Sequence, residues 1–261
     1  MIEGKRIILT RAADKNEPLA TRIAEASGTP VVFPTIATTP VSDDHVIRAA
    51  LTHLERFAFI VFTSAEAVAY LGRLLPTLPC GEGQPQYAAV GSVTAEALRA
   101  HGVSEVLVPD DFRAEGLIEI FAQIAQETAP GAAVLIPRAL VAREVLPQAL
   151  EQLGFNVTVA PLYETVMPEV DARELGRIVN TDKEPQLLAD AVVFASSSAV
   201  RNFVTIMGRA SLDGAALLAR VDCYSIGAPT TAALRRIGVP EERVHQAAEA
   251  TTDGLFTALI S

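Results

Sequence analysis

The sequence of 261 residues has no tryptophan, only two cysteines and four histidines, and aromatic residues make up 5% of it. The two cysteines, Cys80 and Cys223, lie in unlike contexts with no shared spacing, so we expect reduced thiols rather than a disulfide framework. The histidines fall on expected helices or linkers without the spacing of metal ligands, which argues against a metal centre and a catalytic triad. They are His45, His53, His101 and His245.

Positive charge is also scarce, because 21 lysines and arginines stand against 31 aspartates and glutamates, giving a net charge of −10. Such a balance argues against a nucleic-acid-binding surface. No apolar run approaches the roughly 20 residues that span a membrane. The first residues, Met1–Arg6, lead directly into a strand-like run without the apolar region of a secretory signal. We therefore expect a cytoplasmic protein that binds neither nucleic acid nor membrane.

Familiar signatures of cofactor and nucleophile chemistry are missing as well. Residues 81–83 (Gly-Glu-Gly) lack the third glycine and the preceding strand of a dinucleotide-binding turn, and no P-loop occurs. Residues 196–198, three serines, are not enclosed by the G-x-S-x-G pattern of a hydrolase nucleophile. The sequence thus gives no reason to expect a cofactor.

What the sequence does contain is repeated strand–turn–helix units. Residues 224–238 are an apolar run that breaks at Gly227, offers Thr230 and Thr231 as helix caps, and closes with glycine after an Ala/Leu pattern. Residues 88–102 repeat this order. A helix N-terminus carries unpaired N–H groups and a partial positive charge, so both turns are suited to bind anions.

Strand and helix patterns alternate along the rest of the chain, half of which is hydrophobic. Among the helices, we expect one from Glu17 to Ala26 with Asn16 as its N-cap, and one over most of residues 170–188. Alternating strands and helices predict an α/β fold with parallel sheets flanked by helices.

The two halves of the chain match each other at offsets of 126 to 138 residues. Two extended segments beside prolines, 34–40 and 162–168, occupy matching places, and we interpret each as a crossing between domains. Residues 1–36 and 168–261 are then expected to form one domain and residues 40–164 a second, related one, joined by two strands. The matched pairs are Arg11 and Arg138, Gly28 and Gly154, Ser64 and Ser196, Gly91 and Gly227, and Gly116 and Gly254.

Ligands of open α/β sheets bind beyond the carboxyl ends of the strands, so a cleft between two such faces is the expected site. Arg11 and Arg138 suit carboxylate recognition there, and the hydroxyl of Tyr163 could donate a proton. Simpler roles stay open: the turns as N-caps, the arginines as surface charges and the tyrosine as packing over the hinge. The turn residues at these strand ends are Thr63, Ser64, Gly91, Thr94, Ser196, Ser197, Ser198, Gly227, Thr230 and Thr231.

Seven short motifs, in this order and spacing, together resemble the uroporphyrinogen-III synthase family over nearly the whole chain. They are Leu9–Arg11, Val61–Val68, Ala89–Ala95, Leu162–Thr165, Val193–Val200, Ile226–Ala232 and Ala250–Leu255. The resemblance implies two α/β domains joined by a two-stranded β-ladder, which agrees with the two crossings inferred from the repeat.

The resemblance further implies a lyase of tetrapyrrole and heme biosynthesis that needs no cofactor. Its substrate would be hydroxymethylbilane, a linear tetrapyrrole polycarboxylate, which loses water and closes to uroporphyrinogen III with inversion of ring D. Because the bilane can close unaided to the uninverted isomer, the enzyme must fold it so that the inverting attack wins. A monomer is implied, and a transient contact with the preceding enzyme, hydroxymethylbilane synthase, is a further expectation.

By residue, Tyr163 matches the family's tyrosine that is proposed to assist departure of the hydroxyl group. Thr230 and Thr231 match a threonine pair at the cleft. The other strand-end turns, with Ala65 included, are implied to hold the substrate's carboxylates through N–H and hydroxyl groups. One departure from the family is Ala195, where many relatives carry a hydroxyl residue.

A substrate with eight carboxylates raises an electrostatic difficulty for a chain of net charge −10. Helix N-termini and local arginines must outweigh the overall field, which salt screens beyond about 8–10 Å. We therefore expect a neutral or positive cleft. Two other classes stay open: a two-lobed anion-binding protein without catalysis, which would normally carry a secretory signal, and a nucleotide-using transferase, which lacks its phosphate fingerprints here.

Overall fold

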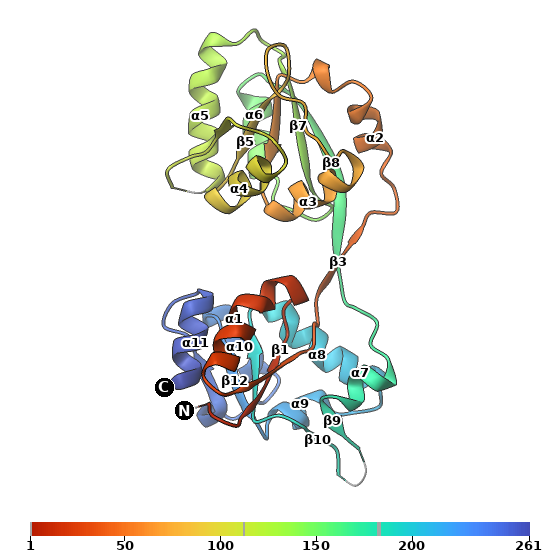
Figure 1. Cartoon of the computed structure of the whole chain (residues 1–261), viewed down its shortest axis with the longest axis vertical. Coiled ribbons are helices and arrows are strands. Elements are labelled where there is room, and N and C mark those ends of the chain that lie inside the picture. Colours follow the sequence, from red (N-terminus) through yellow and green to blue (C-terminus); the bar gives the residue numbers. More distant parts are fainter. Residues whose placement is uncertain (1, 112, 182–183) are drawn as a thin grey trace. The chain divides into compact units, whose positions relative to one another are not determined.

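The computed structural model describes residues 2–111, 113–181 and 184–261, and Figure 1 traces the chain. The chain divides into two compact units. Unit 1 comprises Met1–Ala37 and Val166–Ser261, and unit 2 comprises Thr38–Thr165. Each unit is built around a mainly parallel sheet with a buried apolar cluster on either side, which confirms the predicted α/β class.

Unit 1 holds a five-stranded parallel sheet in the order β13-β12-β11-β1-β2. Helices link the strands that follow one another in the chain, as parallel pairing requires. The strands are β1 (Arg6–Leu9), β2 (Thr29–Val32), β11 (Ala191–Phe194), β12 (Asp222–Ser225) and β13 (Val244–Gln246).

Alternate residues of β1 point to opposite faces of the unit 1 sheet. Ile7 and Leu9 join the cluster under α1 and α11, whereas Ile8 joins the cluster under α8, α9 and α10. Burial on both faces explains why these strands are continuous hydrophobic runs instead of alternating ones. The helices are α1 (Ala13–Glu25), α8 (Ser197–Arg209), α9 (Gly214–Leu218), α10 (Ala228–Arg236) and α11 (Thr252–Ile260).

The prediction of a helix over most of residues 170–188 is wrong. The structure has the short helix α7 (Ala172–Gly176), opened by a capping box at Asp171, and then the antiparallel strands β9 (Val179–Asn180) and β10 (Gln186–Leu187). The two strands pair antiparallel, and the side chains of Val179 and Leu187 are buried in the apolar core of unit 1. Residues 182–183 of the span lie outside the described residues.

Asn16 does not cap α1, contrary to expectation. The helix already begins at Ala13, and Asn16 is buried within it. Its side-chain amide donates to the carbonyl oxygens of Leu9 (3.3 Å) and Arg11 (2.7 Å). Asn16 therefore ties the helix to the carboxyl end of β1, a long-range role that local sequence preference does not reveal.

Unit 2 holds a six-stranded sheet in the order β3-β8-β7-β4-β5-β6. The four pairings from β8 to β6 are parallel. The unit boundaries fall in β3 and β8, which are neighbours in this sheet. The strands are β3 (Ala37–Pro40), β4 (Phe59–Phe62), β5 (Gln86–Ala89), β6 (Val106–Leu107), β7 (Ala133–Ala139) and β8 (Asn156–Val166).

One face of the unit 2 sheet is packed by three mutually edge-on aromatic rings. Phe59 of β4, Phe121 of α5 and Phe155 before β8 have ring centroids 5.1 to 6.1 Å apart. Aliphatic residues of α2, α3 and α4 cover the opposite face. The helices are α2 (His45–Leu51), the 3-10 helix η1 (Leu54–Arg56), α3 (Ala65–Leu74), α4 (Ser92–Ala100), α5 (Ala114–Glu127) and α6 (Val145–Gln152).

In the described parts of the chain, no helix combines the length and apolar character that crossing a bilayer requires. A second 3-10 helix, η2 (Glu241–Arg243), leads into β13 in unit 1. The carboxyl ends of β4, β5, β7 and β8 mark one edge of unit 2, and those of β1, β11 and β12 mark one edge of unit 1. The predicted site residues lie at or near these two edges.

Candidate functional site

Ser64 and Tyr163 meet at the carboxyl edge of unit 2. Ser64 follows β4 and caps α3, since its Oγ accepts the N–H of Ala67 at 3.2 Å. The same Oγ lies 3.1 Å from the hydroxyl oxygen of Tyr163 in β8. A residue that is a helix cap by sequence is thus also the hydrogen-bond partner of the predicted catalytic tyrosine, from 99 positions away.

The Tyr163 ring is held by packing. It is 8% exposed and stacks on Tyr70 of α3, with ring centroids 5.0 Å apart and planes 13° from parallel. The Tyr70 hydroxyl donates to Thr38 Oγ1 at 3.1 Å, and the guanidinium of Arg73 lies over the Tyr70 ring. A rigid ring with a fixed hydroxyl is what proton donation needs, so this packing is compatible with the role predicted for Tyr163.

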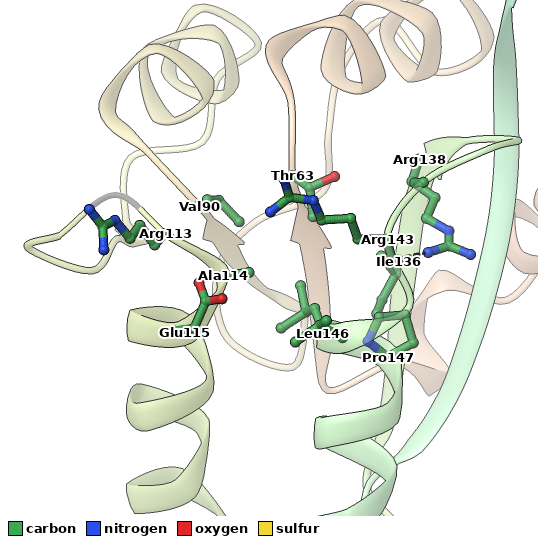
Figure 2. Close-up of a pocket in the computed structure, with 12 residues that line it drawn as sticks. Thr63, Val90, Arg113, Ala114, Glu115, Ile136, Arg138, Arg143, Leu146 and Pro147 are labelled. Carbon is green, nitrogen blue, oxygen red and sulfur yellow. Dashed lines mark hydrogen bonds between the residues drawn. The ribbon is translucent and has the colours of Figure 1, made fainter. Parts of the chain in front are cut away.

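A pocket of about 620 Å³ opens beside this edge within unit 2 (Figure 2). Thr63 at the end of β4 and Val90 after β5 line one part of it, and the segment after β7 lines another. Leu146 and Pro147 of α6 supply apolar wall. The remaining lining residues are Arg113, Ala114, Glu115, Ile136, Arg138, Ala142, Arg143 and Val145.

Arg138 is the sixth residue of β7 and only 6% exposed. Its Nη1 donates to the carbonyl oxygen of Arg143 at 2.9 Å, and its Nη2 pairs with the carboxylate of Glu144. Its Nε is buried without a hydrogen-bond partner in the described structure. Most of the guanidinium is therefore engaged by the chain itself, which is a different role from the free carboxylate receptor expected at this position.

Two kinds of helix start occur at the strand ends. Serine opens α3 and α8 and satisfies an N–H of its own helix, at Ser64 and at Ser196. Glycine opens α4 and α10, and neither Gly91 nor Gly227 offers a side-chain cap. The N–H groups at the start of α4, and those of Gly227 and Ala228 before Pro229 at the start of α10, have no side-chain cap and can donate hydrogen bonds to an anion.

Three serines form a small hydroxyl cluster at the carboxyl end of β11 in unit 1. The Oγ atoms of Ser196 and Ser198 are 3.0 Å apart, and Ser197 Oγ donates to the carbonyl oxygen of Pro229 at 2.9 Å. All three side chains are half-buried. The cluster therefore joins the start of α8 to the start of α10.

Thr231 belongs to a buried hydroxyl chain in unit 1. Its Oγ1 lies 2.6 Å from Ser225 Oγ and donates to Gln246 Oε1 at 2.9 Å. Thr230, beside it on α10, is 3% exposed. Neither threonine caps α10, contrary to expectation, because the helix already begins at Ala228 with Gly227 as its N-cap. Both are buried inside the first turns, and the hydroxyl of Thr231 is engaged by β12 and β13.

Arg11 lies just after β1, half-buried, and its Nη1 reaches Thr252 Oγ1 of α11 at 3.4 Å. Arg11 and Arg138 thus occupy matching places in the two sheets but differ in engagement. Thr94 in α4 is 6% exposed, and Ala65, the first residue of α3, is half-buried.

The resolved pKa shifts lie away from these strand ends. Burial raises the pKa of the Cys223 thiol to about 12, so this thiol stays protonated and unreactive near neutral pH. Burial also raises the pKa of Tyr224 and of Tyr87. No group of three or more His, Cys, Asp or Glu residues suited to hold a metal ion is found among the described residues.

Comparison with known proteins decides the family. The model of the family described as "Uroporphyrinogen-III synthase HemD" matches residues 17–257. The chain belongs to the uroporphyrinogen-III synthase family. The uroporphyrinogen-III synthase of Synechococcus elongatus is 29% identical over 265 residues, which cover 98% of this chain and 94% of the relative. That of Chlorobaculum parvum is 27% identical over 239 residues and 90% of both chains.

Solved structures support the fold of this uroporphyrinogen-III synthase family member. The crystal structure of uroporphyrinogen-III synthetase from Helicobacter pylori matches with a TM-score of 0.56 at 16% identity over 98% of both chains. A mutant synthase from Thermus thermophilus matches with a TM-score of 0.51 at 20% identity, over 97% of this chain and 96% of that one. The family resemblance inferred from the seven motifs is confirmed, and a non-catalytic binding protein is not favoured.

The structure groups the expected residues of this family member by unit. In unit 2 it brings Ser64 to Tyr163, and places Thr63 and Arg138 in one pocket. Tyr70 and Arg143 were missed, although the exposed cation of Arg143 close after a strand end was a usable signal. Tyr70 stacks on Tyr163, a residue far from it in the chain, so no local sequence pattern predicts the contact.

Proposed function

We propose that this member of the uroporphyrinogen-III synthase family converts hydroxymethylbilane into uroporphyrinogen III, as a lyase that acts without a cofactor. The observation that carries the activity is the family match over residues 17–257, with named synthases aligned along almost their whole length. The substrate is a linear tetrapyrrole with eight carboxylates. Recognition is therefore mainly recognition of carboxylates and of pyrrole faces.

The chemistry proceeds in three balanced steps. The terminal hydroxyl takes up a proton and leaves as water, which produces an azafulvene cation. The substituted α-carbon of ring D attacks this cation and forms a spiro intermediate. The bond from that α-carbon to the bridge carbon of ring C then breaks and leaves a second azafulvene cation, to which the unsubstituted α-carbon of ring D bonds. Loss of a proton from the ring carbon restores the pyrrole, so protons gained and lost balance.

Tyr163 is proposed as the group that supplies the proton to the departing hydroxyl. Its hydroxyl oxygen lies 3.1 Å from Ser64 Oγ, and the stack on Tyr70 fixes the orientation of the ring. A phenol hydroxyl held in place by packing can act as a general acid toward a departing hydroxyl group. The Ser64 hydroxyl can accept a hydrogen bond from the phenol and donate one to the phenolate. Ser64 and Tyr163 therefore stay hydrogen-bonded before and after the proton is transferred.

The other strand-end residues are proposed to bind the substrate's carboxylates. The N-terminal N–H groups of α4 and α10 serve this role at Gly91 and Gly227, because no side chain caps these helices. Hydroxyl groups and Arg11 at the remaining turns supplement them, and Arg138 contributes by anchoring the segment that follows it, since its guanidinium is engaged by Arg143 and Glu144. The supplementing residues are Arg11, Thr63, Ser64, Ala65 through its N–H, Thr94, Ser196, Ser197, Ser198, Thr230 and Thr231.

Several finer expectations belong to the same proposal. We expect domains of residues 1–36 with 168–261 and of residues 40–164, with 34–40 and 162–168 as the interdomain strands. We also expect a cytoplasmic monomer that meets hydroxymethylbilane synthase transiently. Size-exclusion chromatography alone, and again with that enzyme present, tests the last two points.

Complementation in cells tests the activity. The protein is expressed in a bacterial strain whose own uroporphyrinogen-III synthase gene has been deleted and which grows only with added heme. Growth without heme is the expected result. Soluble expression without growth would count against the proposal. Expression of Tyr163→Phe at the same level should give slower growth if the phenol supplies the proton.

A further inference from the structure

The segment between β7 and α6, residues 140–144, projects from the edge of unit 2. Leu140 is 48% exposed and Val141 88% exposed, and both belong to the few large hydrophobic residues that the described chain leaves open to solvent. Val145, at the start of α6, is 49% exposed. Exposed apolar side chains gathered in one place indicate a contact surface for a ligand.

The same segment carries an uncommitted cation. The Arg143 side chain is exposed, lines the pocket, and has no hydrogen bond or ion pair within the described residues. In Figure 2 it extends toward Thr63, whereas the guanidinium of Arg138 points away from Thr63. Arg143 is thus the guanidinium that faces the pocket.

Arg138 holds this segment in place from inside the sheet. It is buried in β7 and donates from Nη1 to the carbonyl oxygen of Arg143 itself, at 2.9 Å. Its Nη2 fixes the neighbouring Glu144 carboxylate. Because both anchors lie directly after the Cα of Arg143 in the chain, they hold the backbone from which that side chain enters the pocket.

The charges of the pocket select the occupant. Of the three arginines that line it, Arg138 is paired with Glu144, which leaves Arg113 and Arg143 against one lining carboxylate, Glu115. A local excess of positive charge on a chain of net charge −10 favours an anionic group. A planar guanidinium can hold a carboxylate by two parallel hydrogen bonds.

We propose that Arg143 binds one acetate or propionate carboxylate of the tetrapyrrole, that Val141 and Leu140 cover the adjoining pyrrole face, and that Arg138 is the positioning residue of Arg143. This inference rests on the proposed function. It assigns the carboxylate contact to Arg143 and makes the contribution of Arg138 indirect.

Steady-state kinetics with hydroxymethylbilane, generated in situ, tests the assignment. Arg143→Gln should raise KM about tenfold, leave kcat within about twofold and still give isomer III, because a charge-assisted contact to the substrate is lost without damage to the reacting groups. Arg143→Lys keeps the charge but not the fork, so its KM should fall between those of the wild type and Arg143→Gln.

Arg99→Gln is the matched control, because the substitution removes the same charge from the same unit. Arg99 is exposed in the last turn of α4 and does not line the pocket. Its KM should equal that of the wild type. Raising the salt concentration should raise the KM of Arg143→Gln less steeply than that of the wild type or of Arg99→Gln. The reason is that Arg143→Gln already lacks the arginine–carboxylate pair that salt screens in the other two proteins. A general loss of structure would not produce this change of slope.

Glu144→Gln tests the positioning half, because it removes the charge of one of the two anchors and leaves the buried Arg138 side chain intact. KM should rise about threefold, and the thermal unfolding midpoint should fall, because a buried guanidinium loses its charged partner while the glutamine oxygen can still accept its hydrogen bond. A wild-type KM for this variant would refute positioning through Arg138. Equal KM values for Arg143→Gln and Arg99→Gln, with isomer III formed by the wild type, would overturn the carboxylate assignment alone. No isomer III from the wild type would overturn the proposed function as well.

Discussion

The hydrogen bond between Tyr163 and Ser64 makes a sharp test of the proposed chemistry. In Tyr163→Phe the ring keeps its stack on Tyr70, at 5.0 Å between centroids, and loses only the hydroxyl that lies 3.1 Å from Ser64 Oγ. The lost hydrogen bond should cost about 1 kcal/mol of unfolding free energy. That corresponds to a fall of about 2–5 °C in Tm for a unit of this size.

The rate should fall much more than the stability. A positioned general acid contributes about 100-fold or more, so kcat of Tyr163→Phe should drop by roughly that factor. Because the bilane also closes unaided, slower enzymatic closure should shift the product toward isomer I. The assay is a time course of both isomers, with Tm measured on the same preparations.

Tyr70→Phe is the matched control. It too is a buried tyrosine that loses one hydroxyl contact at 3.1 Å, in this case to Thr38, while the stack survives. Its Tm should fall by a similar amount with kcat within about twofold of the wild type. Equal kcat values for Tyr163→Phe and Tyr70→Phe would refute the role of the Tyr163 phenol.

Three further predictions concern stability and reactivity. Thr231→Val should lower the unfolding free energy by about 1–3 kcal/mol in urea titrations, because its two hydrogen-bond partners lose their contact and one of them is fully buried. A thiol reagent at pH 8 should label Cys80 quickly and Cys223 only after denaturation. A pKa of about 12 for Cys223 leaves roughly one of its thiols in 10⁴ ionised at that pH. Equal labelling rates for the two cysteines would contradict the burial of Cys223. Gly254→Ala should lower the unfolding free energy by about 1–3 kcal/mol, because the added Cβ would meet the carbonyl oxygen of Glu249. Gly208→Ala should be neutral or stabilising, because the space around Gly208 in α8 is open. Equal Tm values for the two variants would contradict the close packing at Gly254.

Local sequence patterns predicted the parts of the fold that depend on local physics. The serine after β4 and the serine after β11 were expected as N-caps, and Ser64 and Ser196 are caps. These signals are readable because a cap satisfies N–H groups within three residues of itself. The expectation that Thr230 and Thr231 cap the helix after Gly227 was wrong, because α10 already begins at Ala228 and both threonines lie inside it.

Sequence reasoning failed where a distant contact overrides local preference. Asn16 is a good cap residue by type, yet it is buried inside α1 and donates to Leu9 and Arg11. The span 170–188 contains helical residues, but the burial of Val179 and Leu187 favours a strand pair. In both cases tertiary packing outweighs a propensity that amounts to well under 1 kcal/mol per residue.

The candidate site divides in the same way. Tyr163 and the strand-end turns followed from motif order, whereas its partner Tyr70 did not. Arg138 was identified as a site residue, but only the structure reveals that it is occupied with Arg143 and Glu144. The direction of a long side chain depends on all its neighbours, so position in a strand does not fix what the guanidinium contacts.

The most direct test of the central claim is the isomer composition of the product in vitro. Hydroxymethylbilane is generated in situ, the purified protein is added without any cofactor, and the porphyrinogens are oxidised and separated by chromatography. The account predicts predominantly uroporphyrin III, formed faster than the spontaneous isomer I in a protein-free control. A product mixture identical to that control would contradict it.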